Sequence, residues 1–305
     1  MKISIFSGAG ASLEDSVNEV VAAENDGFAG FWFGHIFNAD ALTTIALAGA
    51  KTKRIELGTG VVPIYLHHPF AMAQQAMTVQ AAIGGRLALG IGLSHQPVIE
   101  GMWGLSYAKP AKYMREYLSV VRPLVHEGKV SYQGETFRVA AGIQVADAKP
   151  FPILIAALAP MMLRIAGELA DGTVTWMTGP KTIESHVVPR MSKSAANAGR
   201  PAPRVCAALP VAVTDDVAAA RERAGQLFQI YGQLPNYKRM LDREGVEGPS
   251  DVAIVGDEAE VERQIRGMAS AGATDLLAAS FPVGDDAAAS IARTRALLKV
   301  LIGKV

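Results

Sequence analysis

Residues 152–170, PILIAALAPMMLRIAGELA, place an apolar run directly before a helical stretch, and this order decides the fold. The run at residues 153–157 is apolar at every position, which is typical of a strand buried on both faces of a parallel sheet. Pro160 then stands at the expected first position of a helix, where its missing N–H has no helical partner. The stretch therefore predicts one strand–helix unit of an α/β protein.

Seven further apolar runs alternate with helical patterns along the chain. The predicted strands lie at residues 2–7, 29–33, 55–62, 86–91, 153–157, 173–177, 205–213 and 275–279. Ser12 can N-cap the first helix, and later helices are predicted at residues 43–50, 69–82, 110–126, 160–170, 180–198, 215–229, 258–271 and 285–301. Eight such units in about 300 residues favour a (β/α)8 TIM barrel. An open doubly wound sheet is the alternative, since it needs no particular number of strands.

Two intervals are longer than an ordinary connection between a strand and a helix. Residues 127–152 have the character of a small hairpin before the fifth strand, and residues 231–256 form a polar segment with glycine and proline. No low-complexity or Ser/Gly-rich linker separates parts of the chain. We therefore expect one domain over residues 1–305, with these two intervals as insertion segments of the barrel.

The composition excludes several functional classes. Apolar residues make up 50% and charged residues 19%, so a large core can form and global disorder is excluded. Lys+Arg and Asp+Glu both number 29, which removes the electrostatic basis for a nucleic-acid or anionic-membrane partner. Cys206 is the one cysteine, so neither an intrachain disulfide nor a cysteine zinc site is expected. The sequence shows neither the roughly 7–15-residue apolar core of a signal peptide nor the roughly 18–20 apolar residues of a membrane span, so we expect a cytoplasmic protein.

Histidines at the carboxyl ends of the predicted strands are candidates for chemistry, because TIM-barrel active sites lie at that end. His35 follows the second strand and His95 the fourth. An imidazole in this place can donate a hydrogen bond to a cofactor or transfer a proton. A hydrogen-bonded structural histidine is the alternative for each. The pair His67-His68 has no third ligand at suitable spacing, so no metal site is predicted.

Glycine pairs and one helix start indicate how a ligand is held. The Gly-x-Gly pairs at residues 58–60 and 90–92 lack the third glycine of a dinucleotide fingerprint, and no P-loop occurs. Glycine at these strand ends either lets a flat ligand approach the backbone or serves tight packing inside the barrel. The helix that begins at Pro160 leaves backbone N–H groups unpaired at its first turn, which suits a phosphate.

Several segments, taken in this order, resemble the luciferase-like flavin and deazaflavin oxidoreductases, especially the subgroup that uses the 8-hydroxy-5-deazaflavin coenzyme F420. The resemblance covers nearly the whole chain. Its strongest segments are residues 32–35 (WFGH), 54–61 (RIELGTGV), 68–69 (HP), 86–92 (RLALGIG), 152–160 (PILIAALAP) and 162–172 (MLRIAGELADG).

The resemblance implies a cofactor lying across the barrel mouth against a bulge at Gly60-Val61, where the family often has a cis peptide bond. His35 is implied near the reactive face of the ring, and His95 is the second candidate catalytic residue. The implied cofactor-binding residues are Gly60, Val61, Ala157, Leu158, Ala159, Pro160, Met161 and Gly179. Two positions depart from the family, which often has Asp in place of Gly34 and Gly in place of Ala159.

The function implied by the resemblance is that of an F420-dependent oxidoreductase, which moves a hydride between the deazaflavin coenzyme and a small organic substrate. An FMN-dependent luciferase-like monooxygenase on the same scaffold is the alternative. A non-catalytic coenzyme-binding or carrier protein is the alternative of another class. Similar proteins are often dimers, so a homodimer is expected, without nucleic-acid or membrane partners.

Overall fold

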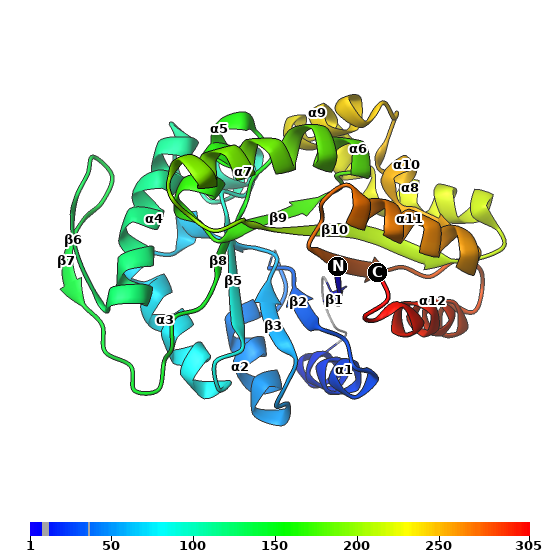
Figure 1. Ribbon diagram of the computed structural model, residues 1–305, viewed down its shortest axis with the longest axis horizontal. Coiled ribbons are helices and arrows are strands. Elements are labelled where there is room, and N and C mark those ends of the chain that lie inside the picture. The colour runs from blue at the N-terminus through cyan, green and yellow to red at the C-terminus, as the bar shows by residue number, and fades with distance from the viewer. Residues whose placement is uncertain (8–11, 36) are drawn as a thin grey trace.

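The parallel sheet closes into a ring in the computed structural model, which describes residues 1–7, 12–35 and 37–305 (Figure 1). The ring order is β1, β2, β3, β5, β8, β9, β10 and β12, and β12 pairs back onto β1. The strands span Lys2–Ser7, Gly30–Phe33, Glu56–Thr59, Leu87–Gly92, Ile153–Ala156, Gly172–Trp176, Arg204–Val213 and Asp275–Ser280. Closure confirms the predicted (β/α)8 barrel and excludes the open doubly wound sheet.

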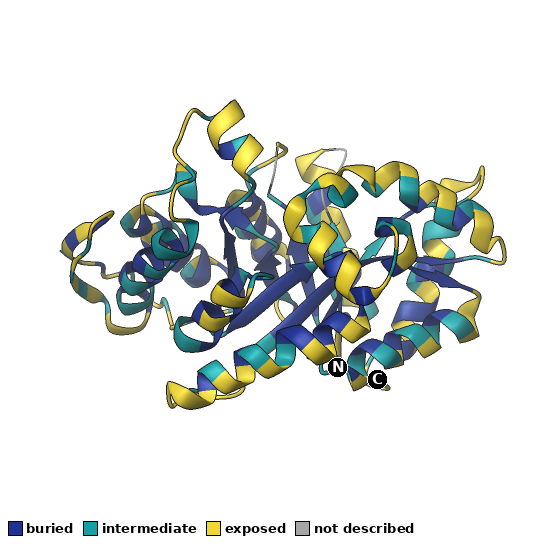
Figure 2. Ribbon diagram, turned by 90° about the horizontal axis from the view of Figure 1, so that it is seen from above, coloured by how far each residue is buried: buried dark blue, intermediate teal, exposed yellow. Residues whose placement is uncertain are grey.

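Helices cover the outside of the ring, and the strands between them are buried (Figure 2). The helices are α1 Leu13–Asp26, α2 Ala41–Lys51, α3 Pro69–Ala82, α4 Pro110–Glu127, α5 Pro160–Leu169, α6 Pro180–Thr182, α7 Val188–Asn197, α8 Val217–Gln233, α9 Pro235–Glu244, α10 Pro249–Val252, α11 Glu258–Ser270 and α12 Ala287–Leu301. Ser12 caps α1 by accepting the Asp15 N–H, and Pro69, Pro110 and Pro160 each open a helix. The predicted helix starts at these positions are confirmed.

The two long intervals differ in structure. β6 (Lys129–Gln133) and β7 (Arg138–Gly142) form an antiparallel hairpin, which confirms the prediction for that interval. The hairpin turn is held by the buried carboxylate of Glu116 in α4, which accepts three backbone N–H groups of the turn. The interval at residues 231–256 is more regular than the sequence indicates. It contains the end of α8, all of α9 and α10, and β11 (Ile254–Gly256), which pairs with the end of β10.

Large side chains fill the inside of the barrel, and glycines make room for them. A Cβ on Gly58 would lie 2.4 Å from the Trp32 ring, and one on Gly92 would lie 2.5 Å from Val61. A Cβ on Gly90 would lie 2.0 Å from the backbone oxygen of Thr59. For these three glycines the structure supports packing, not ligand approach, of the two alternatives left open by the sequence.

Gly90→Ala is expected to destabilise the protein by about 1–3 kcal/mol, because the added methyl group would overlap a backbone atom that cannot rotate away. The Thr59 hydroxyl also bonds the N–H and C=O of Gly90, so a shift would strain the β3–β5 contact. Thermal or urea unfolding measures the loss. Gly101→Ala is the matched control, since a Cβ there has no neighbour within 4 Å. Equal stability of the two variants would contradict the packing role of Gly90.

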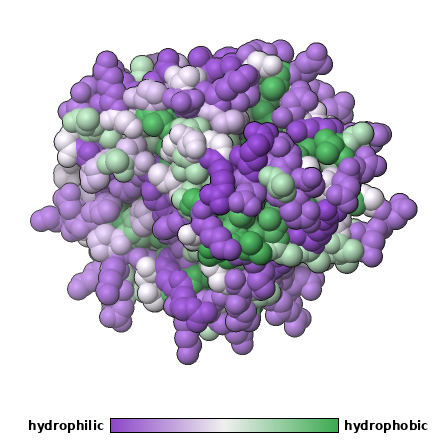
Figure 3. Space-filling model, turned by 45° about the vertical axis from the view of Figure 1, so that its right-hand side comes forward, coloured by the Kyte–Doolittle hydropathy of each residue, from purple (hydrophilic) through white to green (hydrophobic). Residues whose placement is uncertain are grey.

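The surface is mainly hydrophilic on the face drawn in Figure 3, where apolar residues form small patches between polar ones. Most apolar side chains instead pack between strands and helices or inside the barrel. Within the described part of the chain, no helix is both long enough and apolar enough to cross a membrane.

Candidate active site at the barrel mouth

The predicted site residues follow five strands that are neighbours on the ring, namely β2, β3, β5, β8 and β9. Parallel strands bring their carboxyl ends to one face of the barrel. His35, the Gly60-Val61 bulge, His95, the turn at residues 157–161 and Gly179 therefore lie along one arc of the mouth.

The bulge after β3 breaks the strand predicted at residues 55–62. The Gly60-Val61 peptide bond is cis, as the resemblance implies, and the chain resumes pairing as β4 (Val62–Pro63). A Cβ on Gly60 would lie 2.6 Å from the Phe6 ring, so the ring covers this glycine closely. Phe6 in turn lies 5.7 Å from Trp176, between ring centroids. Phe6, Val61 and Trp176 are half-buried and form an apolar floor over the barrel interior.

His35 is held at the start of α2. Its Nδ1 accepts the Ala41 N–H at 3.3 Å, and the side chain is only 15% exposed. Because Nδ1 is an acceptor here, the neutral ring carries its proton on Nε2, which is left as a donor. Burial lowers the pKa of His35, although the carboxylate of Asp40, 3.7 Å from Nδ1, acts in the opposite direction. His35 is therefore a neutral hydrogen-bond donor near pH 7.

Asp40 and His67 complete the surroundings of His35. Asp40 caps α2 by accepting the Thr43 N–H at 2.7 Å, so its carboxylate is fixed. Asp40 thus places an acid beside His35. Gly34 stands at the position before His35 where the resemblance implies an acid. The His67 ring lies 6.3 Å from that of His35, edge to face, and burial lowers its pKa. His68, by contrast, caps α3 by accepting the Phe70 N–H.

His95 lies on a different wall of the mouth from His35. Its ring is 5.6 Å from that of Tyr237 in α9, and burial lowers its pKa. Tyr237 also packs against Tyr231, whose ring lies 5.7 Å from that of Trp176. Among the described residues no hydrogen bond or ring contact joins His35 to His95. The structure thus gives the two histidines separate surroundings.

The start of α5 carries free backbone donors. Ala159 is the N-cap, and no side chain caps this helix. Over the described ranges, the N–H groups of Ala159, Met161 and Met162 have no acceptor in the protein. These groups and the helix dipole favour an anion at this place. Arg164 turns away toward Glu168, with Nε to Oε1 at 2.5 Å, so the backbone supplies the donors.

Gly179 has a different environment from the α5 start. A Cβ there would lie 2.5 Å from the carboxylate of Glu244, and this carboxylate accepts the N–H groups of Lys181 and Thr182. Glu244 is buried at the end of α9. The donors next to Gly179 are therefore already used by the protein, and a ligand phosphate fits the α5 start better.

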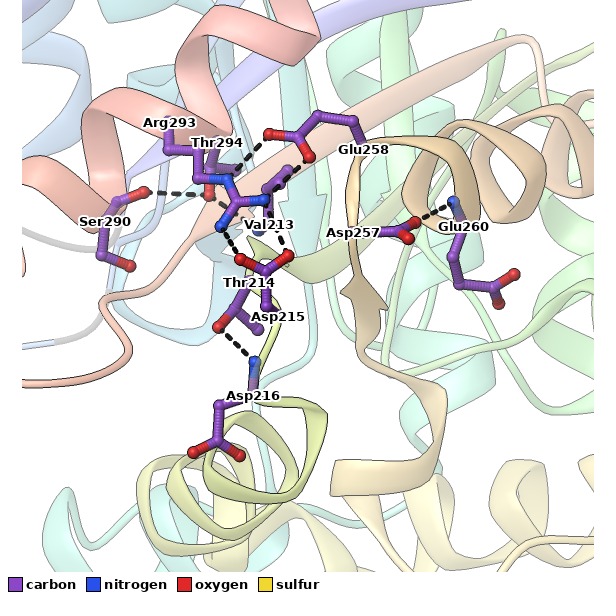
Figure 4. Close-up of polar contacts among 10 residues, drawn as sticks. All are labelled: Val213, Thr214, Asp215, Asp216, Asp257, Glu258, Glu260, Ser290, Arg293 and Thr294. Atoms are coloured by element: carbon purple, nitrogen blue, oxygen red, sulfur yellow. Dashed lines mark hydrogen bonds and ion pairs between the residues drawn. The ribbon is translucent and has the colours of Figure 1, made fainter.

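Arg293 fixes the opposite rim of the mouth (Figure 4). It bonds Asp215 at 3.0 Å and Glu258 at 2.7 Å, and so joins the loop after β10 and the first residue of α11 to α12. The hydrogen bonds from Arg293 lower the pKa of Glu258 to about 2. The buried Thr294 hydroxyl accepts the Val213 N–H at the end of β10. These contacts hold the β10–β12 side of the mouth in place.

The sequence reasoning missed four residues that shape the site. Asp40 had a detectable signal, because an acidic residue before an apolar helix is a typical N-cap. The other three had no such signal, because each contacts a residue far away in the sequence. Glu244 accepts the Thr182 N–H, and the Tyr237 ring packs against His95. His186 bonds the Leu158 carbonyl oxygen in the turn before α5.

Protein stability is expected to fall as the pH drops from about 6.5 toward 4.5. Burial lowers the pKa of five histidines, His35, His67, His95, His126 and His186. Below about pH 6.5 the unfolded chain takes up protons that the folded chain does not, so unfolding becomes easier. Glutamates with a lowered pKa begin to contribute toward pH 4.5, and burial raises the pKa of Glu19, so the part of the window between about pH 6.5 and 5.5 reports mainly the histidines. Melting temperatures measured in steps across it give the test, and a constant value would contradict the expectation.

Comparisons with known proteins agree with this architecture. The pattern of the luciferase-like monooxygenase family matches residues 1–300. A 5,10-methylenetetrahydromethanopterin reductase of Methanolobus tindarius is 28% identical over 236 residues, which cover 77% of this chain and 72% of the relative.

Two solved structures share the fold. The coenzyme F420 dependent tetrahydromethanopterin reductase from Methanopyrus kandleri superposes with a TM-score of 0.80 at 22% identity, over 100% of this chain and 98% of that one. The oxygenating constituent of 3,6-diketocamphane monooxygenase of Pseudomonas putida, in complex with FMN, gives 0.77 at 17% identity, over 100% and 97%. With the family pattern spanning nearly the whole chain, the protein belongs to the luciferase-like monooxygenase family and is an oxidoreductase.

Proposed function

We propose that the protein is an F420-dependent oxidoreductase that moves a hydride between the deazaflavin coenzyme and a small organic substrate. One observation carries the proposal. The Gly60-Val61 bulge and the free N–H groups at the start of α5 lie at the same mouth of the barrel. The relatives named as methylenetetrahydromethanopterin and F420-dependent reductases support the choice of cofactor.

The residues at the mouth fit such a cofactor. The apolar floor of Phe6, Val61 and Trp176 suits a flat ring, and the N–H groups of Ala159 and Met161 suit a phosphate. When bound, a deazaflavin supplies two-electron hydride transfer.

His35 and His95 are the proposed groups for proton handling and orientation. His35 presents Nε2–H, since Nδ1 is occupied by the Ala41 N–H. His95 is placed by the Tyr237 ring, which lies 5.6 Å from its own.

The second candidate function is that of an FMN-dependent monooxygenase. The solved FMN complex on the same fold favours it. The α5 start does not discriminate between the cofactors, because both carry a phosphate. The two differ in ring chemistry, since reduced flavin reacts readily with oxygen.

Titration of apo-protein with F420 and with FMN at matched salt tests the proposal, followed by absorbance. We expect tighter binding of F420 and substrate oxidation or reduction without oxygen uptake. Micromolar FMN binding with no F420 binding, together with substrate-dependent oxygen uptake, would move the protein to the monooxygenase class. Tight binding without turnover of any substrate would favour a carrier.

A further inference from the structure

We propose that His186 is a positioning residue for the cofactor phosphate, which acts by fixing the turn between β8 and α5. The proposal rests on the proposed function, because that function places the phosphate at the start of α5. His186 lies outside the strand-end residues considered so far, in the π-helical segment Ile183–Val187 before α7.

His186 makes one strong contact. Its Nε2 lies 2.7 Å from the carbonyl oxygen of Leu158, and the residue is 1% exposed. The carbonyl is an acceptor only, so Nε2 carries the proton. Nδ1 is buried and has no partner in the part of the chain that the structure describes. A single neutral N–H···O bond therefore joins the π-helical segment to the turn.

This bond sets the direction of the next backbone donor. In a planar trans peptide the C=O and the N–H point to opposite sides. When His186 holds the Leu158 carbonyl, the Ala159 N–H of the same peptide unit points away from His186. The Ala159 N–H is the first of the three free donors at the α5 start. His186 thereby orients a donor that it does not touch.

The segment that carries His186 is itself fixed against α5. A Cβ on Gly167 of α5 would lie 2.5 Å from the backbone oxygen of Met191 in α7, so the two helices are in close contact. Arg190 of α7 also donates to the His186 carbonyl at 3.2 Å. The histidine therefore has a rigid base from which to hold the turn.

The test compares ligands with and without the phosphate, in two variants. His186→Leu removes the donor, and His186→Gln keeps an N–H at the end of the side chain. We expect His186→Leu to weaken binding of F420 and FMN about tenfold, the scale of one lost hydrogen bond. Riboflavin and the phosphate-free 8-hydroxy-5-deazariboflavin should each bind wild type and variant equally. His186→Gln should recover most of the affinity for the phosphate-bearing forms.

Three results would overturn the proposal. These are equal weakening of phosphate-bearing and phosphate-free ligands, no weakening at all, and no recovery in His186→Gln. His126→Leu, at the far end of α4, is the control histidine and should change neither affinity. If His186→Leu does not fold, His186→Asn replaces it, because its shorter amide cannot reach the carbonyl.

Failure of the proposed function gives a different pattern. In that case wild type binds no F420, whatever residue stands at position 186. If wild type binds FMN instead, the comparison of FMN with riboflavin still tests His186, whereas a protein that binds neither cofactor needs another probe. Inorganic phosphate then serves as the probe of the turn itself. It should raise the melting temperature of wild type and of His186→Gln but not that of His186→Leu, and equal stabilisation of all three would count against His186.

Discussion

His35→Ala is expected to slow hydride transfer by about 10²–10⁴-fold, the usual contribution of a positioned acid–base group. The substitution removes the Nε2–H donor at the mouth while leaving the α2 cap on Asp40 intact. Single-turnover absorbance of the bound coenzyme measures the rate. His126→Ala is the control, since that histidine lies in the last turn of α4, away from the mouth. A variant that loses melting temperature but keeps its activity per folded molecule would show a structural histidine instead.

The pH dependence of the wild-type rate gives an independent check on His35. Burial lowers its pKa, so the neutral donor persists below the ordinary histidine value of about 6.5. Activity should therefore fall only on the acid side of that value, as the ring gains a proton and Nδ1 can no longer accept the Ala41 N–H. The acid limb should be absent in His35→Gln.

Met161→Glu is expected to weaken binding of F420 and FMN about 10–100-fold, because a carboxylate would stand a few ångströms from the bound phosphate. Met161 is 52% exposed and occupies the second position of α5. An acidic residue there complements the helix dipole, so the melting temperature should be unchanged or higher. The substitution thus separates an effect on ligand binding from an effect on folding.

Met161→Gln is the matched control, since the glutamine side chain has the same length as that of glutamate and carries no charge. Binding of riboflavin should be nearly equal in both variants. If Met161→Glu binds FMN as well as Met161→Gln does, the phosphate does not lie at the α5 start. Fluorescence titration at low salt gives the largest difference, because salt screens the repulsion.

The barrel was predictable from the sequence because its signals are local. Apolar runs mark strands buried on both faces, and prolines such as Pro69 and Pro160 mark helix starts. The apolar run at residues 55–62 predicts one strand, but the cis bond at Gly60-Val61 divides it, and residue types alone do not reveal this. α9 escaped prediction because it is short and mostly polar, although Tyr237, Met240 and Leu241 recur at helical spacing.

The site was only partly predictable, because its geometry depends on contacts between distant segments. The sequence indicated His35, His95 and the α5 start as rim features, and the structure places them at the mouth. It gave no indication that Glu244 occupies the donors beside Gly179. Glycines at residues 90 and 92 were ambiguous from sequence, since the space above them is filled by the Thr59 backbone oxygen of β3 and by the Val61 side chain of the bulge.

The pairing of β12 with β1 sets a condition on synthesis by the ribosome. β1 is made first, but one of its edges stays unpaired until Asp275–Ser280 has been translated. An unpaired apolar strand edge is a template for pairing with other chains. The nascent barrel therefore carries an aggregation-prone edge while the strands between β1 and β12 are being made. Ring closure thus makes correct folding of the barrel depend on the strand that the ribosome delivers last among its eight.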